Sequence, residues 1–441
     1  MEVECSAIRF ALDGAARVAF AALSITSIAP TPCAHNRPIH PNPKRWSDDF
    51  KPRVWLPQTY ALSARTQGEW PGRGGGRYSN HYRHIAIFEG KIMTDTAALP
   101  DIATSEIKHD SAEIEYLATP FKVSRIGLGT WAIGGWMWGG TDETAAIAVI
   151  REAVDRGVTL IDTAPAYGFG RSERIVGKAL TEGGRRQHVV IATKVGLDWK
   201  DGQPFRDASK RRIHKEVDDS LRRLRTDVID LYQVHWPDPN VPIEETAAAM
   251  AELQRAGKIR LIGVSNFSPA QIEAFGKVAP VQTVQPPYNL FERAIEEDVL
   301  PYCRNKNIDT LAYGSLCRGL LSGRMTAQTK FDGDDLRKVD PKFRAPRFEQ
   351  YLRAVERLDR FAQANYGRRV IHLALRWVLD RQDSTIALWG ARRPDQLAPI
   401  SSLSGWHIDA SAMAEIDRIV SETIVDAVGP EFMAPPVQLA A

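Results

Sequence analysis

Short apolar runs alternate with amphipathic stretches along residues 113–430. Apolar residues spaced three and four apart predict helices, whereas brief β-branched runs bounded by turn residues predict buried strands. This pattern predicts eight strands, over 124–131, 158–163, 189–194, 228–235, 259–266, 281–285, 309–313 and 385–389. The body of the chain therefore reads as a series of strand–helix units.

Helices are predicted between and after these strands, over 141–156, 172–181, 210–224, 243–256, 268–275, 295–305, 348–363, 371–379 and 410–423. Thr141 is expected to cap the first of them, and Pro269 lies in the first turn of the fifth. Eight such units favour a (β/α)8 barrel, because doubly wound sheets usually stop at about six strands. No G-x-G-x-x-G follows the first strand, and residues 113–123 can supply a short N-terminal β-hairpin.

The first 112 residues lack a sustained pattern and are predicted to be a largely disordered leader. Eight prolines lie from Pro30 to Pro71, and a glycine run covers 74–76. Residues 1–92 hold 12 Lys/Arg and 7 Asp/Glu, a net charge of +5, so the overall charge of +3 arises in this leader. Residues 113–430 are expected to form the barrel, and 431–441 a C-terminal tail.

Three interpretations of the leader stay open. The apolar run 18–29 is long enough for a secretory signal, but acidic residues precede it and no small-x-small cleavage site follows. A basic interaction arm is the second possibility. The third, which we favour, is that translation begins at Met93, because the codons of Glu89 and Gly90 can spell a purine-rich ribosome-binding sequence. Residues 1–92 would then be dispensable.

Composition excludes several classes of protein. With 44% hydrophobic and 25% charged residues the chain is ordinary globular material. The sequence contains no run of 18 apolar residues, so it predicts no membrane-spanning helix. Four cysteines without paired ligand spacing argue against a disulfide scaffold and a zinc site, so we expect no metal and a cytoplasmic, reducing location. The nearly neutral body gives no electrostatic footprint for nucleic acid.

Polar residues at the carboxyl ends of the predicted strands are the candidates for chemistry, because barrel active sites lie there. In chain order they are Asp162, Tyr167, Lys194, His235, Ser265, Asn266, Gln285 and Tyr313. Charges at the inner end of a barrel strand are costly unless they are paired. We therefore expect Asp162, Lys194, Tyr167 and His235 to converge.

This group of side chains suits the reduction of a carbonyl. A neighbouring ammonium is expected to lower the pKa of a phenol, a carboxylate holds the lysine in place, and an imidazole orients the carbonyl oxygen. The phenol would then donate a proton to an oxygen that gains charge during hydride addition. No side chain donates hydride, so a cofactor is required.

The chain resembles the aldo-keto reductase superfamily over about residues 114–430. The resemblance rests on motifs at 126–135 (IGLGTWAIGG), 161–173 (IDTAPAYGFGRSE), 192–196 (ATKVG), 231–238 (LYQVHWPD), 257–267 (GKIRLIGVSNF), 285–293 (QPPYNLFER) and 388–397 (LWGARRPDQL). Further runs, including YGSLCRGLL and VGPEFMAPP, are most similar to the bacterial general stress protein 69 type. Together these motifs are highly specific.

The resemblance implies a role for each matching residue. Tyr167 would be the general acid, tuned by Lys194 and Asp162, and His235 would orient the carbonyl. The nicotinamide end of NADPH would be bound by Thr130, Trp131, Asp162, Ser265, Asn266, Gln285 and Tyr313. The phosphates and ribose would be bound by Gly314, Ser315, Leu316, Cys317, Arg318, Arg324, Arg337, Gly390, Ala391, Arg392 and Gln396. Arg392 or Arg393 beside a 2′-phosphate favours NADPH over NADH.

The substrate pocket implied by the same motifs is aromatic, formed by Trp131, Trp136, Phe169, Trp199 and Trp236. It suits small or aryl carbonyl compounds. Two alternatives remain: an NADP-dependent polyol or sugar dehydrogenase, and a cofactor-binding regulatory subunit like the potassium-channel β subunits. The sequence lacks the proline expected after Tyr313 and has Pro399-Ile400 where the family has Glu-Asn. A monomer or weak homo-oligomer is expected.

Overall fold

The structure is a computed structural model that describes residues 86–88, 91–93, 116–118 and 122–437. The chain divides into two units, Met1–Thr94 and Asp95–Ala441. In the first unit, β1 (Ala86–Phe88) and β2 (Lys91–Met93) form a short antiparallel hairpin that the sequence analysis did not predict. The apolar run and the prolines of the leader lie outside the described residues.

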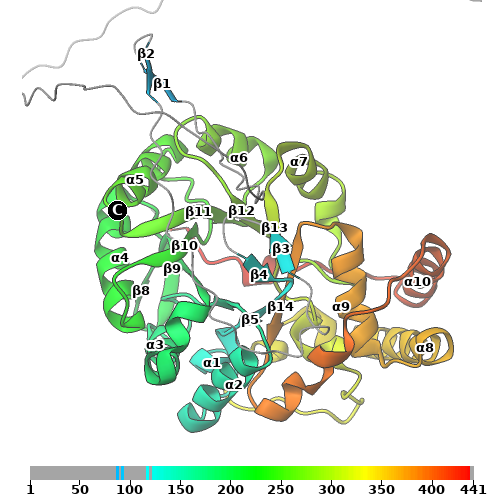
Figure 1. The fold of residues 1–441 in the computed structure, drawn as a ribbon. Helices are drawn as coiled ribbons and strands as arrows, with labels where there is room; N and C mark the ends of the chain where they lie inside the picture. The colour runs from blue at the N-terminus through cyan, green and yellow to red at the C-terminus, as the bar shows by residue number, and fades with distance from the viewer. Residues whose placement is uncertain (1–85, 89–90, 94–115, 119–121, 438–441) are drawn as a thin grey trace, which may run out of the picture. The chain divides into compact units, whose positions relative to one another are not determined.

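The second unit is a closed barrel of eight parallel strands, which confirms the predicted fold class (Figure 1). The strands are β5 (Ile126–Gly129), β6 (Leu160–Asp162), β7 (Val190–Val195), β10 (Ile229–Val234), β11 (Ile259–Ser265), β12 (Thr283–Gln285), β13 (Asp309–Ala312) and β14 (Thr385–Gly390). β14 pairs with β5 and closes the ring. The register sets Lys194 beside Gln233 and Ser265 beside Gln285.

Helices surround this ring (Figure 1). They are α1 (Trp131–Gly134), α2 (Glu143–Asp155), α3 (Arg171–Thr181), α4 (Lys210–Leu224), α5 (Ile243–Arg255), α6 (Pro269–Gly276), α7 (Val299–Lys306), α8 (Arg347–Tyr366), α9 (Val370–Arg381) and α10 (Ala410–Thr423). None of these described helices is both long and apolar enough to cross a lipid bilayer.

Local sequence explains where the helices begin. α6 begins with a capping box made by Ser268 and Gln271, with Pro269 at its first position as expected. The predicted cap of α2 was wrong by one residue. Asp142, not Thr141, accepts hydrogen bonds from the amides of Thr144 and Ala145, and a carboxylate there also faces the positive end of the helix.

Two antiparallel hairpins accompany the barrel. β3 (Tyr116–Ala118) and β4 (Lys122–Ser124) form the N-terminal hairpin that the sequence predicted. β8 (Leu197–Lys200) and β9 (Gln203–Arg206) form a second hairpin directly after β7, which the sequence analysis missed. This second hairpin follows the strand that carries Lys194, so it lies at the catalytic end of the barrel.

Alternation along the strands separates two kinds of core. Inward-facing side chains form one buried cluster within the barrel: Val123, Leu160, Val190, Ala192, Leu231, Leu311, Ile386 and Leu388. The neighbouring residues on the same strands, such as Ile191 and Tyr232, pack outward against the helices. On β7 the inward series Val190, Ala192 continues to Lys194, so the apolar interior ends in a charged layer.

Candidate active site

The lysine and the carboxylate at the inner strand ends form one hydrogen-bonded pair. Lys194 Nζ lies 2.8 and 2.7 Å from the two oxygens of Asp162 and 2.9 Å from the carbonyl oxygen of Thr163. It also donates to Tyr167 Oη at 3.2 Å. An ammonium can only donate, so the phenol oxygen accepts this bond and its own hydrogen points elsewhere. The phenol is thus arranged as a proton donor to a third group.

The protonation of this group differs from the expectation in one respect. Desolvation, followed by the charges of Asp162 and Tyr313, raises the pKa of Tyr167 well above its ordinary value of 10.0. The predicted lowering by Lys194 was therefore wrong in direction, because Asp162 neutralises the ammonium while the phenol loses its hydration. The tyrosine consequently holds its proton throughout the neutral range.

His235 lies beside the phenol as a neutral imidazole. The two ring centroids are 5.8 Å apart and the rings are nearly perpendicular. Desolvation, together with the charge of Lys194, lowers the pKa of His235 well below its ordinary value of 6.5. A neutral imidazole can donate a hydrogen bond to a carbonyl oxygen without competing with Tyr167 for the transferred proton.

Two glutamines hold the carboxylate from inside the barrel. Gln285 Nε2 donates to Asp162 Oδ1 at 2.8 Å, and Gln233 Nε2 approaches the same oxygen at 3.4 Å. The two amides also contact each other at 3.3 Å. Sequence analysis missed Gln233, although the alternation of β10 places it on the inward face with Leu231.

Replacing Gln233 by methionine should lower kcat about fivefold while leaving cofactor affinity unchanged. A neutral hydrogen bond contributes about 1 kcal/mol net, which corresponds to about that factor in rate when it is spent on positioning Asp162. Steady-state kinetics and a cofactor titration would measure both. Gln254→Met, at a half-buried position on α5, is the matched control. An unchanged kcat would remove Gln233 from the positioning network.

Residues at the ends of β11 to β13 form a second linked group. Ser265 Oγ donates to the carbonyl of Gln285 at 2.7 Å, and Asn266 Nδ2 donates to the carbonyl of His235 at 3.0 Å. Tyr313 Oη donates to Asn266 Oδ1 at 3.0 Å. Asn266 adopts a left-handed backbone conformation with φ of 61°, which asparagine tolerates better than most residues. Four of the predicted nicotinamide residues, Ser265, Asn266, Gln285 and Tyr313, are thus linked by hydrogen bonds to the four candidate catalytic residues Asp162, Tyr167, Lys194 and His235, called the tetrad below.

A cavity of about 660 Å³ opens from the tetrad toward the loop after β14. Many of the predicted site residues line it: Trp131, Asp162, Tyr167, Tyr313, Gly314, Ser315, Leu316, Arg318, Arg337, Gly390, Ala391, Arg392, Arg393 and Gln396. Others do not: Thr130, Lys194, His235, Ser265, Asn266, Gln285, Cys317, Arg324, Trp136, Phe169, Trp199 and Trp236. The sequence analysis assigned no role to Asp142, Gly319, Leu388 or Met433, which also line it.

Aromatic side chains continue from the cavity past the phenol. Trp131 stacks on Tyr167, with centroids 6.0 Å apart. In a second group of rings, Phe169 lies 5.1 Å from Trp136 and 5.7 Å from Trp199. Trp236 belongs to neither group of rings and lies under the guanidinium of Arg206 at 5.2 Å. Tyr167 therefore stacks on Trp131, while Phe169, two residues further along the chain, joins a separate group of rings with Trp136 and Trp199.

Comparison with known proteins now adds the family. The model of the aldo/keto reductase family matches residues 125–421. The chain belongs to the aldo/keto reductase family. The chain is 62% identical to the aldo-keto reductase YhdN of Bacillus subtilis over 320 residues. This match covers 73% of the chain and 97% of that relative.

Two further relatives bear on its chemistry. The NADH-specific methylglyoxal reductase of Escherichia coli is 38% identical over 296 residues, covering 63% of the chain and 89% of that relative. The solved structure of a glycerol dehydrogenase from Gluconobacter oxydans is 49% identical with a TM-score of 0.66, covering 74% of the chain and all of that structure. The chain is thus a bacterial-type member of an oxidoreductase family that generally binds a nicotinamide cofactor.

The cavity has features that fit such a cofactor. Gly314 has a φ of +68°, and a Cβ there would meet no atom closer than 3.9 Å, so the backbone is open to a ligand. Trp131 Nε1 and Trp138 Nε1 are buried donors that find no acceptor among the described residues. Arg392 and Arg393 line the far end and supply positive charge. Open backbone, unpaired donors and cations together suit a phosphate-bearing dinucleotide.

The arginines that line the cavity are not equally available to a phosphate. Arg318 is buried and pairs with Glu292 at 2.5 Å and Asp340 at 2.7 Å, so its charge is already compensated. Among the residues that the structure describes, the guanidinium of Arg392 donates to the carbonyl oxygens of Trp138 and Gly140, at 2.9 and 2.6 Å. An arginine held by neutral carbonyls keeps its full charge for an anion. Arg318 instead anchors the loop that follows β13.

Cys317 and Met433 complete the corrections to the predicted site. Cys317, expected beside the cofactor phosphates, is fully buried and does not line the cavity, and burial raises its pKa to about 12, so its thiol stays protonated and unreactive at neutral pH. Met433 lines the cavity from the segment predicted to be a C-terminal tail. The carbonyls of Pro435 and Pro436 accept hydrogen bonds from Arg206, so this segment is packed onto the barrel.

Proposed function

We propose that this chain is an NADPH-dependent reductase that converts aldehydes and ketones to alcohols, with Tyr167 as the general acid. The observation that carries the proposal is the bond from Lys194 Nζ to Tyr167 Oη at 3.2 Å, made by an ammonium that Asp162 holds in place. We propose further that it acts in the cytoplasm on small carbonyl compounds, as a monomer or weak homo-oligomer.

The side chains divide the work of one reduction. Bound NADPH would supply the hydride that adds to the carbonyl carbon. Tyr167 gives its proton to the carbonyl oxygen, so the C=O double bond becomes a C–O single bond and the product is an alcohol. Lys194 stabilises the phenolate that remains, because its ammonium already donates to that oxygen. His235, neutral and adjacent, donates a second hydrogen bond that orients the carbonyl.

Oxidation of a polyol is the second candidate, because a 49% identical solved structure carries the name glycerol dehydrogenase. The same tetrad serves both directions. In the oxidative direction Tyr167 must first be a phenolate, which then removes the alcohol proton. Desolvation raises the pKa of Tyr167 and keeps the phenol protonated at neutral pH. This protonation state suits the general acid of a reduction, so at neutral pH it favours reduction over oxidation.

The pH dependence of the two directions tests this assignment. Carbonyl reduction should be nearly constant from about pH 6.5 to about pH 10, since the raised pKa of Tyr167 keeps the acid protonated and the lowered pKa of His235 keeps the imidazole neutral. Alcohol oxidation should rise steadily with pH over the same range. Initial rates for a panel of aldehydes, ketones and polyols with NADPH and NADP⁺ would measure both.

Two results would count against the proposal. A reductase rate that falls between pH 7 and 9 would show that Tyr167 loses its proton in that range. Tight NADPH binding without turnover of any carbonyl or polyol would instead favour a cofactor-binding regulatory protein.

A further inference from the structure

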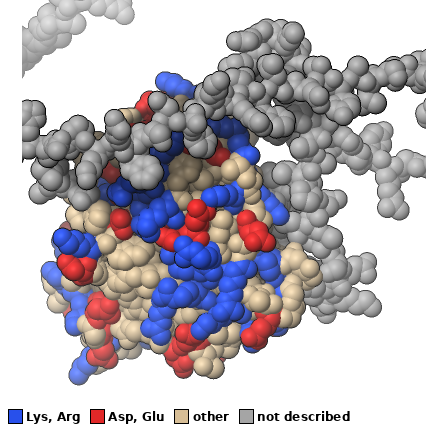
Figure 2. Space-filling view, turned by 90° about the vertical axis from the view of Figure 1, so that its left-hand side faces the viewer, with Lys and Arg blue, Asp and Glu red and all other residues tan. Residues whose placement is uncertain are grey.

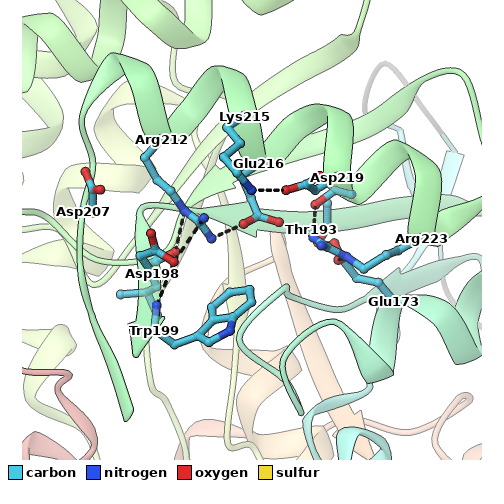
Figure 3. Close-up of polar contacts among 12 residues, drawn as sticks. Glu173, Thr193, Asp198, Trp199, Asp207, Arg212, Lys215, Glu216, Asp219 and Arg223 are labelled. Atoms are coloured by element: carbon cyan, nitrogen blue, oxygen red, sulfur yellow. Dashed lines mark hydrogen bonds and ion pairs between the residues drawn. The ribbon is translucent and has the colours of Figure 1, made fainter. Parts of the chain in front are cut away.

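A chain of opposite charges lies on the outer side of the barrel wall, between β7 and helices α3 and α4 (Figure 3). Glu216 pairs with both Arg212 and Arg223 on its own helix. Arg223 Nε reaches Glu173 Oε2 of α3 at 2.5 Å, and Thr193 Oγ1 of β7 donates to Glu173 Oε1 at 2.7 Å. Glu173 and Glu216 are almost completely buried. The chain of charges thus starts on the strand that carries the catalytic lysine.

The other end of this charge chain holds the β8–β9 hairpin. Arg212 Nε donates to the carbonyl of Leu197 at 3.1 Å, and its Nη1 pairs with Asp198 at 3.2 Å. The same guanidinium lies over the ring of Trp199 at 5.1 Å. One side chain, only 5% exposed, therefore contacts three consecutive residues of the hairpin. Figure 3 shows Arg212 between Glu216 and the segment Asp198-Trp199.

The second arginine supports the turn that carries Phe169. Gly170 has a φ of +85°, and a Cβ there would lie 2.7 Å from Arg223 Cδ. The stem of Arg223 therefore packs directly against this turn. Trp199 thus lies under Arg212, and Gly170, the residue that follows Phe169, packs against Arg223; the Phe169 and Trp199 rings are 5.7 Å apart. Because both arginines bind Glu216, the hairpin that carries Trp199 and the turn that carries Phe169 are linked through one carboxylate.

We propose that this charge chain positions the Phe169–Trp199 pair, and that Arg212 thereby makes the enzyme prefer aryl carbonyl substrates to small aliphatic ones. The inference rests on the proposed function and on the aromatic substrate pocket expected from the sequence, since neither ring lines the cavity described above. Phe169 lies two residues after Tyr167, and Trp199 lies on the hairpin that directly follows the strand of Lys194. A buried ion pair contributes little stability compared with apolar residues of the same size, because desolvation offsets its attraction. The planar guanidinium of Arg212 instead binds several partners at once, and this fixes the position of the hairpin relative to α4.

The surface of the same helix provides the contrast. Figure 2 shows the side of the barrel covered by α3, α4 and α5, where Lys and Arg are interspersed with Asp and Glu. There Arg211, whose side chain is 85% exposed, approaches Asp207 at 3.9 Å. A contact this long, made by an arginine open to solvent, fixes little geometry, because water competes for the guanidinium. Arg211 is consequently a matched control for its neighbour Arg212.

The test uses Arg212→Lys in the full chain. Lysine keeps the charge that Glu216 requires, but its single ammonium cannot bond Leu197 and Asp198 together while covering the indole of Trp199. We expect kcat/KM for 4-nitrobenzaldehyde to fall about tenfold because KM rises. A change of about this size is typical when one apolar contact to the substrate is lost. The value for propanal and both kcat values should stay unchanged. Arg211→Lys should match the wild type with both substrates.

A mutant cycle with Trp199→Ala separates positioning from general destabilisation. If Arg212 acts through the indole, Arg212→Lys should add nothing to the aryl discrimination of Trp199→Ala. An Arg212→Lys effect that persists in the Trp199→Ala background, or an equal loss with both aldehydes, would overturn the proposal. Should Arg212→Lys fold poorly, the half-buried Asp198→Asn gives the second test. It should lower aryl kcat/KM in the same direction, and no change would overturn the proposal.

Hydrogen exchange distinguishes this inference from the proposed function, because it needs no turnover. Amides of 197–206 should exchange faster in Arg212→Lys than in the wild type or in Arg211→Lys. Unchanged exchange would refute the positioning role even in an active reductase. An inactive wild type with faster exchange in Arg212→Lys would refute carbonyl reduction while supporting the role of Arg212 in holding the hairpin.

Discussion

Replacing Tyr167 by phenylalanine should lower kcat for carbonyl reduction by about 10²–10⁴-fold, the usual contribution of a positioned general acid. Phenylalanine keeps the ring that stacks on Trp131 at 6.0 Å and removes only the hydroxyl that accepts from Lys194. Cofactor affinity should therefore change little. Steady-state kinetics with an aldehyde, together with a titration of NADPH by tryptophan fluorescence, would measure the two effects separately.

The matched control for this variant is Tyr302→Phe, a tyrosine of α7 whose ring contacts Lys306 at 5.9 Å, away from the cavity lining. It should retain wild-type kinetics. Turnover within about threefold of the wild type in Tyr167→Phe would be incompatible with the proposed acid. A parallel loss of NADPH affinity would show that the hydroxyl acts on binding of the cofactor more than on proton transfer.

Much of the fold follows from local pattern. α4 and α10 begin and end where the sequence predicts, because charged and apolar positions alternate with a clear helical period. Several strands were predicted too long, as in β6, where the prediction 158–163 shortens by three residues to Leu160–Asp162. Hydrogen bonding to both neighbours defines a barrel strand, and a single sequence does not contain that information.

In the candidate site, too, some features can be predicted from local sequence and others depend on the folded structure. Asp162 and Lys194 could be predicted as a pair, because each ends a buried strand and neither charge is stable there alone. Gln233 has no such signal, since an amide inside the barrel could equally bond to backbone. The rise in the pKa of Tyr167 could not be predicted either. It arises from desolvation, with Asp162 and Tyr313 acting in the same direction, and these surroundings exist only in the folded site.

The hairpin after β7 and the C-terminal segment illustrate what remains hidden. β8 and β9 are four residues each, with Pro204 in the second, so neither shows a strand pattern on its own. They are held by side chains distant in sequence. Arg212 binds the first strand and Arg206 of the second strand binds the carbonyls of Pro435 and Pro436. Long-range contacts of this kind leave no local periodicity.

The last prediction concerns the choice between NADPH and NADH. Replacing Arg392 and Arg393 together by alanine should raise the Kd of NADPH by about 10²-fold and leave that of NADH nearly unchanged. A charge-assisted hydrogen bond contributes about 1.5–3 kcal/mol when buried. Arg393 is 59% exposed and pairs with Asp395 at 3.0 Å, so we discount its share and expect about tenfold from each arginine.

The single variants separate the two arginines. Arg392 also binds the carbonyls of Trp138 and Gly140. Because NADH lacks the 2′-phosphate, an Arg392→Ala variant that disturbed this loop would weaken NADH binding as well, whereas we expect only NADPH binding to change. Arg360→Ala is the control, since Arg360 is an exposed arginine of α8 that pairs with Glu356 at 2.7 Å and does not line the cavity. Equal weakening of both cofactors in the double variant would assign the arginines to the fold or to the shared phosphates. NADH binding stronger than NADPH binding in the wild type would align this chain with its NADH-specific relative and exclude a 2′-phosphate site at Arg392.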